Sequence, residues 1–97
     1  MASIRWTAEA QRWLADIYEH IAADNPQAAA ETVQGIYQRA QTLLEHPERG
    51  RRYRLTDRNV RILLYSHYRI AYLVRADRGI DILGVFHGAL DITSYQL

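Results

Sequence analysis

Hydrophobic positions in the first half of the chain recur every three or four residues, which is typical of amphipathic helices. Thr7 is suited to cap a first helix, because its hydroxyl can accept a hydrogen bond from a free backbone N–H. Asn25 and Pro26 stand where a second helix would begin, and His46-Pro47 would end it. Two helices joined by so short a turn predict an antiparallel hairpin with both apolar stripes facing one way. The stripes are Ala10, Trp13, Leu14, Ile17 and Ile21, then Ala29, Val33, Ile36, Ala40, Leu43 and Leu44.

In the second half, apolar residues alternate with polar ones, and this period of two predicts β-strands. A chain of 97 residues is enough for one domain and too short for two. We therefore expect a single α+β domain over residues 1–97, with an N-terminal strand and an antiparallel helical hairpin packed on an antiparallel sheet of three to five strands. The order would be strand, helix, helix and then the remaining strands, with strands at residues 2–6, 53–55, 60–65, 68–75 and 80–86.

The register of the two hairpins decides which side chains face the helices, because a slip of one residue reverses every side chain. We expect Leu64 opposite Ile70 across a three-residue turn through residues 66–68, and Val74 opposite Ile80. The strand residues that face the helices would then be Val60, Ile62, Leu64, Ile70, Tyr72, Val74, Ile80, Ile82 and Phe86. Arg61, Arg69 and His87 would share the outer face with an exposed apolar row of Leu63, Ala71, Leu73, Leu83 and Val85. Exposed rows of this kind mark interfaces, so a partner peptide is expected along the helical hairpin or the sheet edge.

The formal charge of +1 conceals an uneven distribution. Residues 9–48 carry seven acids and two arginines, whereas residues 49–61 carry six arginines and one aspartate. A low overall charge argues against a general nucleic-acid-binding protein, but a local basic patch can dock on phosphate or on an acidic partner. All twelve basic residues are arginine, whose planar fork suits carboxylate and phosphate. The alternative interpretation is coding bias and an ordinary solvated loop.

The absence of cysteine excludes a disulfide framework, a thiolate nucleophile and a cysteine zinc site. The four histidines are dispersed over helix ends and turns, so we expect no metal site and no cofactor. No stretch approaches the ~20 apolar residues of a membrane span, and residues 1–6 lack the apolar core of a signal peptide. We therefore expect a cytoplasmic protein without membrane association.

Short motifs spread over nearly the whole chain carry more information together than any of them alone. They are Glu9-Ala10, Leu14 to Ile17, Asn25-Pro26 with an alanine run, Leu44 to Pro47 before Gly50-Arg51, Val60 to Leu63, Tyr68 to Tyr72, and Val85 to His87 followed by Asp91. Their order and spacing resemble the ParE/RelE superfamily of bacterial type II toxins. Residues 86–92, where a histidine precedes a short segment that leads to an aspartate, are more similar to the ParE branch.

The resemblance to ParE implies a plasmid-stabilization toxin that inhibits DNA gyrase by binding, and that a cognate antitoxin neutralises in a hetero-oligomer. The RelE branch implies instead a metal-independent endoribonuclease that cuts mRNA on the ribosome. In that branch Arg69 would stabilise the phosphate and His87 would transfer a proton. Gly88 stands where an aromatic residue would follow the histidine, so the catalytic set is incomplete. We therefore expect a binding protein, with the endoribonuclease as the alternative and an inactive relative that retains only antitoxin binding as a third possibility.

The candidate contact residues for antitoxin or target combine the arginine segment with the outward face. Arg69 and His87 are catalytic candidates only in a RelE-like enzyme. The plainer interpretations are that Arg69 pairs with Asp81 or Glu48 and that His87 caps the end of the sheet. The binding candidates are Arg51, Arg52, Arg54, Arg61, Tyr65, Arg69, His87, Asp91 and Tyr95.

Overall fold

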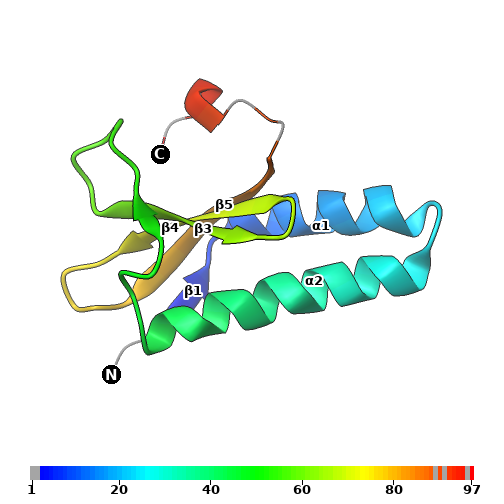
Figure 1. The fold of residues 1–97 in the computed structure, drawn as a ribbon, viewed down its shortest axis with the longest axis horizontal. Helices are drawn as coiled ribbons and strands as arrows, with labels where there is room; N and C mark the ends of the chain where they lie inside the picture. The colour runs from blue at the N-terminus through cyan, green and yellow to red at the C-terminus, as the bar shows by residue number, and fades with distance from the viewer. Residues whose placement is uncertain (1–2, 89, 91, 96) are drawn as a thin grey trace.

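Two helices form a hairpin that covers one face of a five-stranded sheet, which confirms the predicted α+β fold class (Figure 1). The computed structural model describes residues 3–88, 90, 92–95 and 97. The helices are α1 (Ala8–Ala22) and α2 (Pro26–Gln41), and short 3₁₀ turns follow at η1 (Thr42–Leu44) and η2 (Ile92–Ser94). The strands are β1 (Ile4–Trp6), β2 (Arg51–Arg52), β3 (Val60–Tyr65), β4 (Tyr68–Val74) and β5 (Ile80–His87).

Both helices begin at the capping residues that the sequence predicts. The Thr7 hydroxyl accepts a hydrogen bond from the Ala10 N–H and donates one to the carbonyl of Ile82, which joins the start of α1 to β5. Asn25 caps α2 in the same way by accepting from the Ala28 N–H. Leu44 was expected in the apolar stripe but is 38% exposed, because the chain changes from an α-helix to a 3₁₀ turn at Thr42 and loses the helical period.

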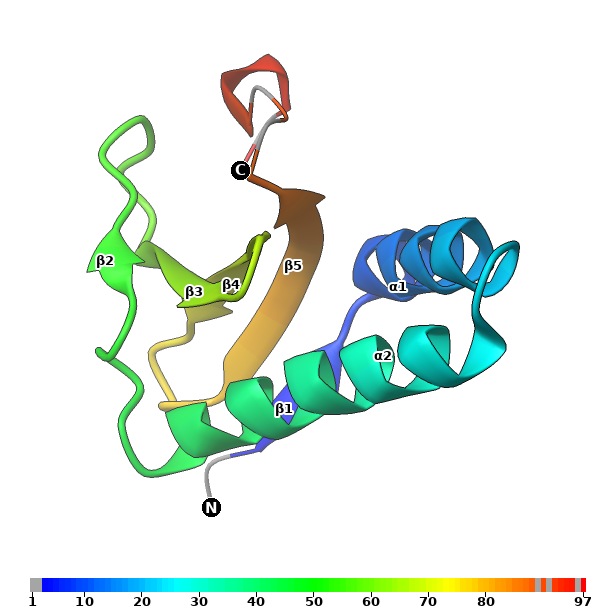
Figure 2. The same cartoon turned by 45° about the vertical axis from the view of Figure 1, so that its right-hand side comes forward.

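The sheet order is β1-β5-β4-β3-β2, with β1 parallel to β5 and every other pair antiparallel. The strand expected at residues 53–55 lies two residues earlier, at β2. Only the Tyr53 N–H extends its pairing, by donating to the Val60 carbonyl at 2.8 Å. Residues 54–59 form a loop that projects beyond the sheet, with Leu55 at 69% exposure (Figure 2). Arg51, Arg52 and Arg54 in this segment are exposed, and Arg52 donates to the carbonyls of Asp57 and Arg58 in the loop.

The register of the β3–β4 hairpin is one residue away from the expected one. Tyr65 pairs with Tyr68 and Leu63 pairs with Ile70, so the turn contains two residues, with Ser66 at φ 53°. Two-residue turns with positive φ are the commonest hairpin connections, because their twist matches the right-handed twist of the flanking strands. Leu63 therefore lies in the helix-facing core, whereas Ile62 and Leu64 face away from the helices.

A β-bulge in β5 changes the second hairpin. Val74 pairs with Ile80 as predicted, but Tyr72 pairs with Ile82 while Ala71 pairs with Gly84, which leaves Leu83 as the additional residue. Beyond the bulge the alternation is reversed. Val85 joins the helix-facing core, and Phe86 packs with Ala71 on the opposite face.

The expected common face of Arg61, Arg69 and His87 is therefore wrong. His87 is opposite Tyr68 and Arg61 is opposite Tyr72, so both lie on the side of the helices. Arg69 pairs with Phe86 and lies on the other side. The exposed row is also wrong, because Leu63, Ala71 and Val85 are buried, and Leu73 and Leu83 are half-buried.

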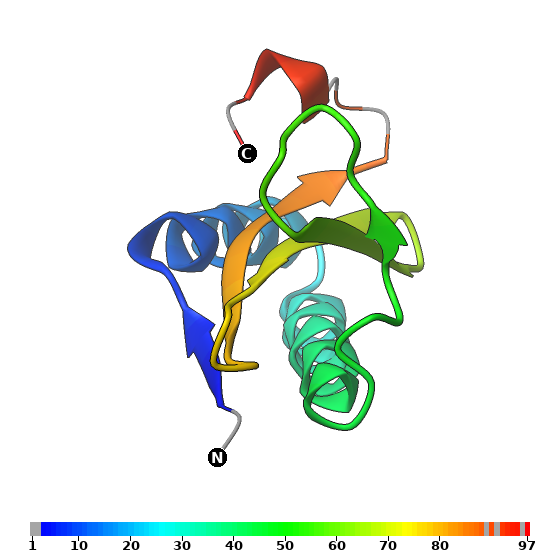
Figure 3. The same ribbon diagram turned by 90° about the vertical axis from the view of Figure 1, so that its left-hand side faces the viewer.

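A second apolar cluster covers the outer face of the sheet. Ala71, Phe86 and Ile92 are buried there, so the turn η2 packs on the face opposite the helices (Figure 3). The Arg58 guanidinium holds the same segment by donating to the Leu97 carbonyl at 2.8 Å. Trp13 of α1 connects the two clusters, since its ring lies 4.7 Å from that of Phe86. The sheet is thus packed over the helix-facing side and over part of the other.

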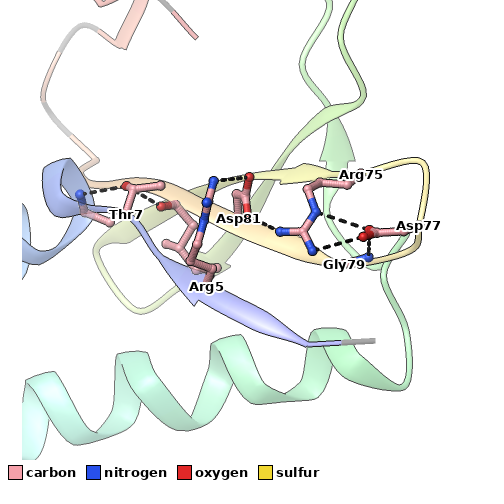
Figure 4. Close-up of polar contacts among 8 residues, drawn as sticks. Arg5, Thr7, Arg75, Asp77, Gly79 and Asp81 are labelled. Carbon is pink, nitrogen blue, oxygen red and sulfur yellow. Dashed lines mark hydrogen bonds and ion pairs between the residues drawn. The ribbon is translucent and has the colours of Figure 1, made fainter. Parts of the chain in front are cut away.

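The edge strand β1 is connected to its neighbour by a buried carboxylate (Figure 4). Asp81 of β5 is 5% exposed and accepts hydrogen bonds from Arg5 of β1 at 3.0 Å and from Arg75 at 2.7 Å. Arg75 also binds Asp77, and this contact, with the Gly79 N–H, lowers the pKa of the Asp77 carboxyl. Two arginines satisfy the buried charge, as a carboxylate removed from water requires.

Candidate functional site

A groove of about 350 Å³ lies on the outer face of the sheet beside the edge strand β2. Its wall is the segment from Arg51 to Arg54, and its floor comes from β3 and β4, which contribute Ile62, Leu64 and Arg69. Four of the predicted binding residues, Arg51, Arg52, Arg54 and Arg69, meet here. The grouping of these side chains makes the groove the candidate site.

A buried hydroxyl determines where the arginine segment starts. Tyr72 of β4 is fully buried, and its hydroxyl donates to the Pro47 carbonyl at 2.7 Å and accepts from the Gly50 N–H at 2.9 Å. Arg61 supports the same loop by donating to the Gly50 carbonyl at 2.9 Å. Burial raises the pKa of the Tyr72 phenol, because the charged phenolate would lose its hydration.

The same loop requires glycine at position 50. A Cβ atom there would lie 2.7 Å from the Tyr72 hydroxyl and 2.9 Å from the Ile62 carbonyl oxygen. Both contacts are shorter than van der Waals distance, so the loop can follow this path only without a side chain. The loop delivers the chain directly into β2, where Arg51 pairs with Ile62.

The groove arginines carry positive charge that no carboxylate neutralises within the described part of the chain. Among the described residues, the arginines that form ion pairs with carboxylates are Arg5, Arg12 and Arg75, and all three lie outside the groove. Arg52 instead donates to the carbonyls of Asp57 and Arg58, and Arg69 donates to the carbonyl of Leu90. Carbonyl oxygens orient a guanidinium without cancelling its charge, so the groove is prepared for an anionic partner.

The floor of the groove is apolar and open to solvent. Leu64 is 64% exposed, and Ile62 is half-buried beside it. Tyr53 contributes an aromatic ring to the same wall. Arginine and tyrosine around exposed aliphatic groups are typical of protein-binding surfaces.

The remaining candidates lie away from the groove. Tyr65 is on the helix-facing side, where the Arg39 guanidinium lies 5.9 Å from the centre of its ring. The His87 ring lies 5.7 Å from Tyr68 and stacks on His67 at 6.4 Å. Tyr95 packs its ring against Trp13 and Phe86. Arg61 supports the loop described above, and Asp91 lies outside the described residues.

The arrangement separates the two residues that RNA cleavage would need together. Arg69 and His87 lie on opposite sides of β4 and β5, so the register does not bring them together on one face. General acid–base chemistry needs the proton-transferring group within hydrogen-bond reach of the reacting oxygen. Across the described residues there is also no cluster of three or more histidine, aspartate or glutamate side chains that could hold a metal ion. In the same part of the chain, neither helix has the length and apolar character needed to cross a bilayer.

Sequence reasoning missed the apolar floor, because Ile62 and Leu64 were placed against the helices. The usable signal was the pair of positions between Tyr65 and Tyr68, which suits a two-residue hairpin turn. With that turn, alternation alone puts Leu64 on the same face as Arg69. The second signal was Gly84, because an isolated glycine inside a strand often marks a bulge.

The sequence profile of the family described as "ParE toxin of type II toxin-antitoxin system, parDE" matches residues 4–92. The chain belongs to the ParE toxin family. A second comparison agrees: the chain is 38% identical over 84 residues to "Putative toxin Y4kP" of Sinorhizobium fredii (strain NBRC 101917 / NGR234), which covers 87% of this chain and 85% of that protein.

Solved structures show the same architecture as this ParE family member. A chain of the chromosomal ParDE toxin–antitoxin system from P. aeruginosa superposes with a TM-score of 0.73 at 26% identity, covering 90% of this chain and 96% of the other. A chain of the RelBE2 toxin–antitoxin complex from Mycobacterium tuberculosis superposes with a TM-score of 0.63 at 22% identity, covering 89% and 96%. The second likeness establishes the shared fold alone.

Proposed function

We propose that this ParE family member inhibits DNA gyrase by binding to it, and that a cognate antitoxin neutralises it in a hetero-oligomer in the bacterial cytoplasm. The family assignment supports a toxin of a type II system. The observation that favours binding over chemistry is the β-bulge at Leu83, which places Arg69 and His87 on opposite sides of the sheet. On this proposal the toxin makes and breaks no bonds and acts by trapping gyrase with its DNA cleaved.

Three surfaces are candidates for contact with gyrase or with the antitoxin. The first is the groove beside β2. The second is the C-terminal segment around Tyr95, which is 39% exposed and borders the Arg58 side chain. The third is the end of the sheet at Tyr65 and His87. Each offers aromatic or cationic side chains of the kind that dominate protein interfaces.

A supercoiling assay with purified gyrase and relaxed plasmid tests the proposal. Wild-type protein at micromolar concentration is expected to stop supercoiling and to increase linear DNA after protein digestion, because the cleaved intermediate is trapped. The matched reaction contains the same protein in a translating extract with a reporter mRNA, which is expected to stay intact. Unchanged supercoiling at micromolar protein would refute gyrase inhibition, and cleavage of the message that Arg69→Ala abolishes would establish the endoribonuclease instead.

The antitoxin half of the proposal has its own test. Growth arrest on induction of the chain is expected to disappear when the adjacent reading frame is expressed with it. The two proteins should then co-purify as one complex through size-exclusion chromatography. Arrest that persists with the neighbouring protein present at equal level would contradict neutralisation.

A further inference from the structure

The end of the sheet next to the β3–β4 turn brings together two of the four histidines of the chain. His67 is the second residue of the turn and His87 is the last residue of β5, and the centres of their rings lie 6.4 Å apart. We propose that His67 and His87 form a binding site for a late first-row transition-metal ion, with Zn²⁺ as the ion that the pair fits. This inference goes beyond the proposed function and does not depend on it.

The backbone holds the two histidines beside each other. His87 is paired across β4 and β5 with Tyr68, the residue that follows His67. The Gly88 N–H donates to the carbonyl of His67 at 2.6 Å, so the chain just after β5 is joined directly to the turn. A Cβ atom at position 88 would lie 3.1 Å from the same carbonyl oxygen, which shows how closely the two segments approach. The histidines are far apart in the sequence, but the hairpin fixes their backbones as neighbours.

The two rings lie close to the spacing that coordination of one ion needs. A Zn–N bond of about 2.0–2.1 Å puts the centre of each imidazole about 3.2 Å from the ion, so two rings of a tetrahedral site have centres about 5 Å apart. The observed spacing of 6.4 Å exceeds this value by only about 1 Å. Both residues are exposed, so a change of side-chain rotamer can close the difference without a change in the backbone.

The chemistry of imidazole decides which ions the pair selects. Histidine is the commonest metal ligand in proteins, and imidazole suits Zn²⁺, Cu²⁺ and Ni²⁺, whereas Mg²⁺ and Ca²⁺ prefer oxygen ligands. Each ring has two nitrogens, so a ring that ligates through one of them can keep a hydrogen bond at the other. Two protein ligands leave the remaining coordination positions to water, and we therefore expect a Kd on the order of 10 μM, weaker than that of a four-ligand structural site.

The other two histidines have different surroundings and supply the controls. His20 lies in the last turn of α1. His46 shares a surface groove with Glu45, Glu48 and two arginines. The carboxylates make this groove the rival site, but the guanidinium groups beside it repel a divalent cation. Replacing His46 therefore tests the rival directly.

Isothermal titration calorimetry of ZnCl₂ into the untagged full chain, in a buffer that does not bind metal, tests the site. The wild-type protein should bind one Zn²⁺ per chain, and MgCl₂ should give no binding signal. His67→Asn and His87→Asn should each weaken zinc binding by at least about tenfold, because each removes one of the two protein ligands. The matched controls His20→Asn and His46→Asn should bind zinc as the wild-type protein does.

A cysteine variant separates ligation from a merely structural role. His67→Cys should bind zinc about tenfold more tightly than His67→Asn, because a thiolate is a strong zinc ligand and a carboxamide is a poor one. Without metal, both variants should unfold at the urea concentration that unfolds the wild-type protein, since the His67 side chain is exposed. Equal zinc affinities of His67→Cys and His67→Asn would contradict a ligating role for this position.

Three further results would overturn the proposal. One is the failure of the folded wild-type protein to bind zinc at millimolar concentration. Another is zinc binding that survives both His67→Asn and His87→Asn. The third is binding that only His46→Asn abolishes, which would move the site to the groove beside Glu45 and Glu48. Gyrase takes no part in these titrations, so wild-type protein without any effect on gyrase would refute the proposed function, while zinc binding would still decide this inference.

Discussion

Replacing Tyr72 by phenylalanine tests how the fold positions its arginine segment. The ring of Tyr72 is fully buried in the helix-facing core, and its hydroxyl makes two hydrogen bonds to the loop that enters β2. Tyr72→Phe keeps the ring and removes both bonds. Nothing else in the core changes volume, so the effect reports the hydroxyl alone.

The expected loss follows from the two partners. A net intramolecular hydrogen bond contributes ~0.5–1.5 kcal/mol, and a buried donor left without a partner costs about 1–3 kcal/mol. Gly50 is buried, so its N–H finds no ready replacement in water. We expect the free energy of unfolding to fall by about 2 kcal/mol, which lowers Tm by roughly 8–15 °C for a domain of this size.

Urea denaturation followed by circular dichroism measures this loss, with an unchanged slope showing that the unfolded state is unaffected. Tyr37→Phe is the matched control, because Tyr37 is 43% exposed and stacks its ring on Trp6. The free energy of unfolding of Tyr37→Phe should stay within about 0.5 kcal/mol of the wild-type value. In Tyr72→Phe, hydrogen exchange should also accelerate at Gly50 before it does in β4. A Tyr72→Phe protein as stable as the control would refute the reasoning.

Three further predictions use the same local geometry. Gly50→Ala should lower the free energy of unfolding by about 1–3 kcal/mol in the same urea assay, because its Cβ would clash with the Tyr72 hydroxyl and the Ile62 carbonyl. The free energy of unfolding should fall as pH rises above 10.0, the ordinary pKa of tyrosine. Burial raises the pKa of Tyr72 in the folded protein, so the unfolded chain loses that proton first. In Tyr72→Phe the fall should be shallower. Asp81→Asn should lower the free energy of unfolding by about 2 kcal/mol. It should also speed hydrogen exchange at Ile80, whose N–H donates to the Ser3 carbonyl just before β1. The control Glu9→Gln should change neither the stability nor the exchange.

The helical half of the fold was predictable because its signals are local. Thr7, Asn25 and Pro26 each act on backbone groups within one turn of their own positions, and the structure places all three where the sequence indicates. The apolar stripes follow from the helical period and need no knowledge of the partner. The prediction failed at the end of the second helix: α2 ends at Gln41 and not at His46-Pro47, and Leu44 leaves the apolar stripe because the period changes there.

The sheet was harder, because its register depends on turn geometry and on a bulge rather than on composition. The alternation of β3 favours the wrong parity, since Val60, Ile62 and Leu64 are more apolar than Arg61, Leu63 and Tyr65. The second apolar cluster made this choice ambiguous, because it gives outward-facing residues something to pack on. An argument that assumes one buried face cannot anticipate it.

The candidate site was predicted in its charge and missed in its shape. Arginine density along residues 49–61 needs only counting, and Arg51, Arg52 and Arg54 do share a groove. The floor depends on the β3–β4 turn. That no carboxylate of the described residues pairs with the groove arginines depends on distances that no sequence pattern supplies. Arg69 was placed on the right face while its two expected companions were not.

A single additional residue in β5 links the packing to the proposed function. By reversing alternation at Leu83, the bulge moves Phe86 to the outer face, where Ala71 and Ile92 bury it. The same reversal takes His87 away from Arg69, so the residues that could have formed a nuclease site serve different surfaces. With helices on one face and the C-terminal turn on part of the other, the outer face stays open beside β2. That open part carries arginines that form no ion pair with a carboxylate of the described residues, and this coincidence supports the proposal that the protein acts by binding.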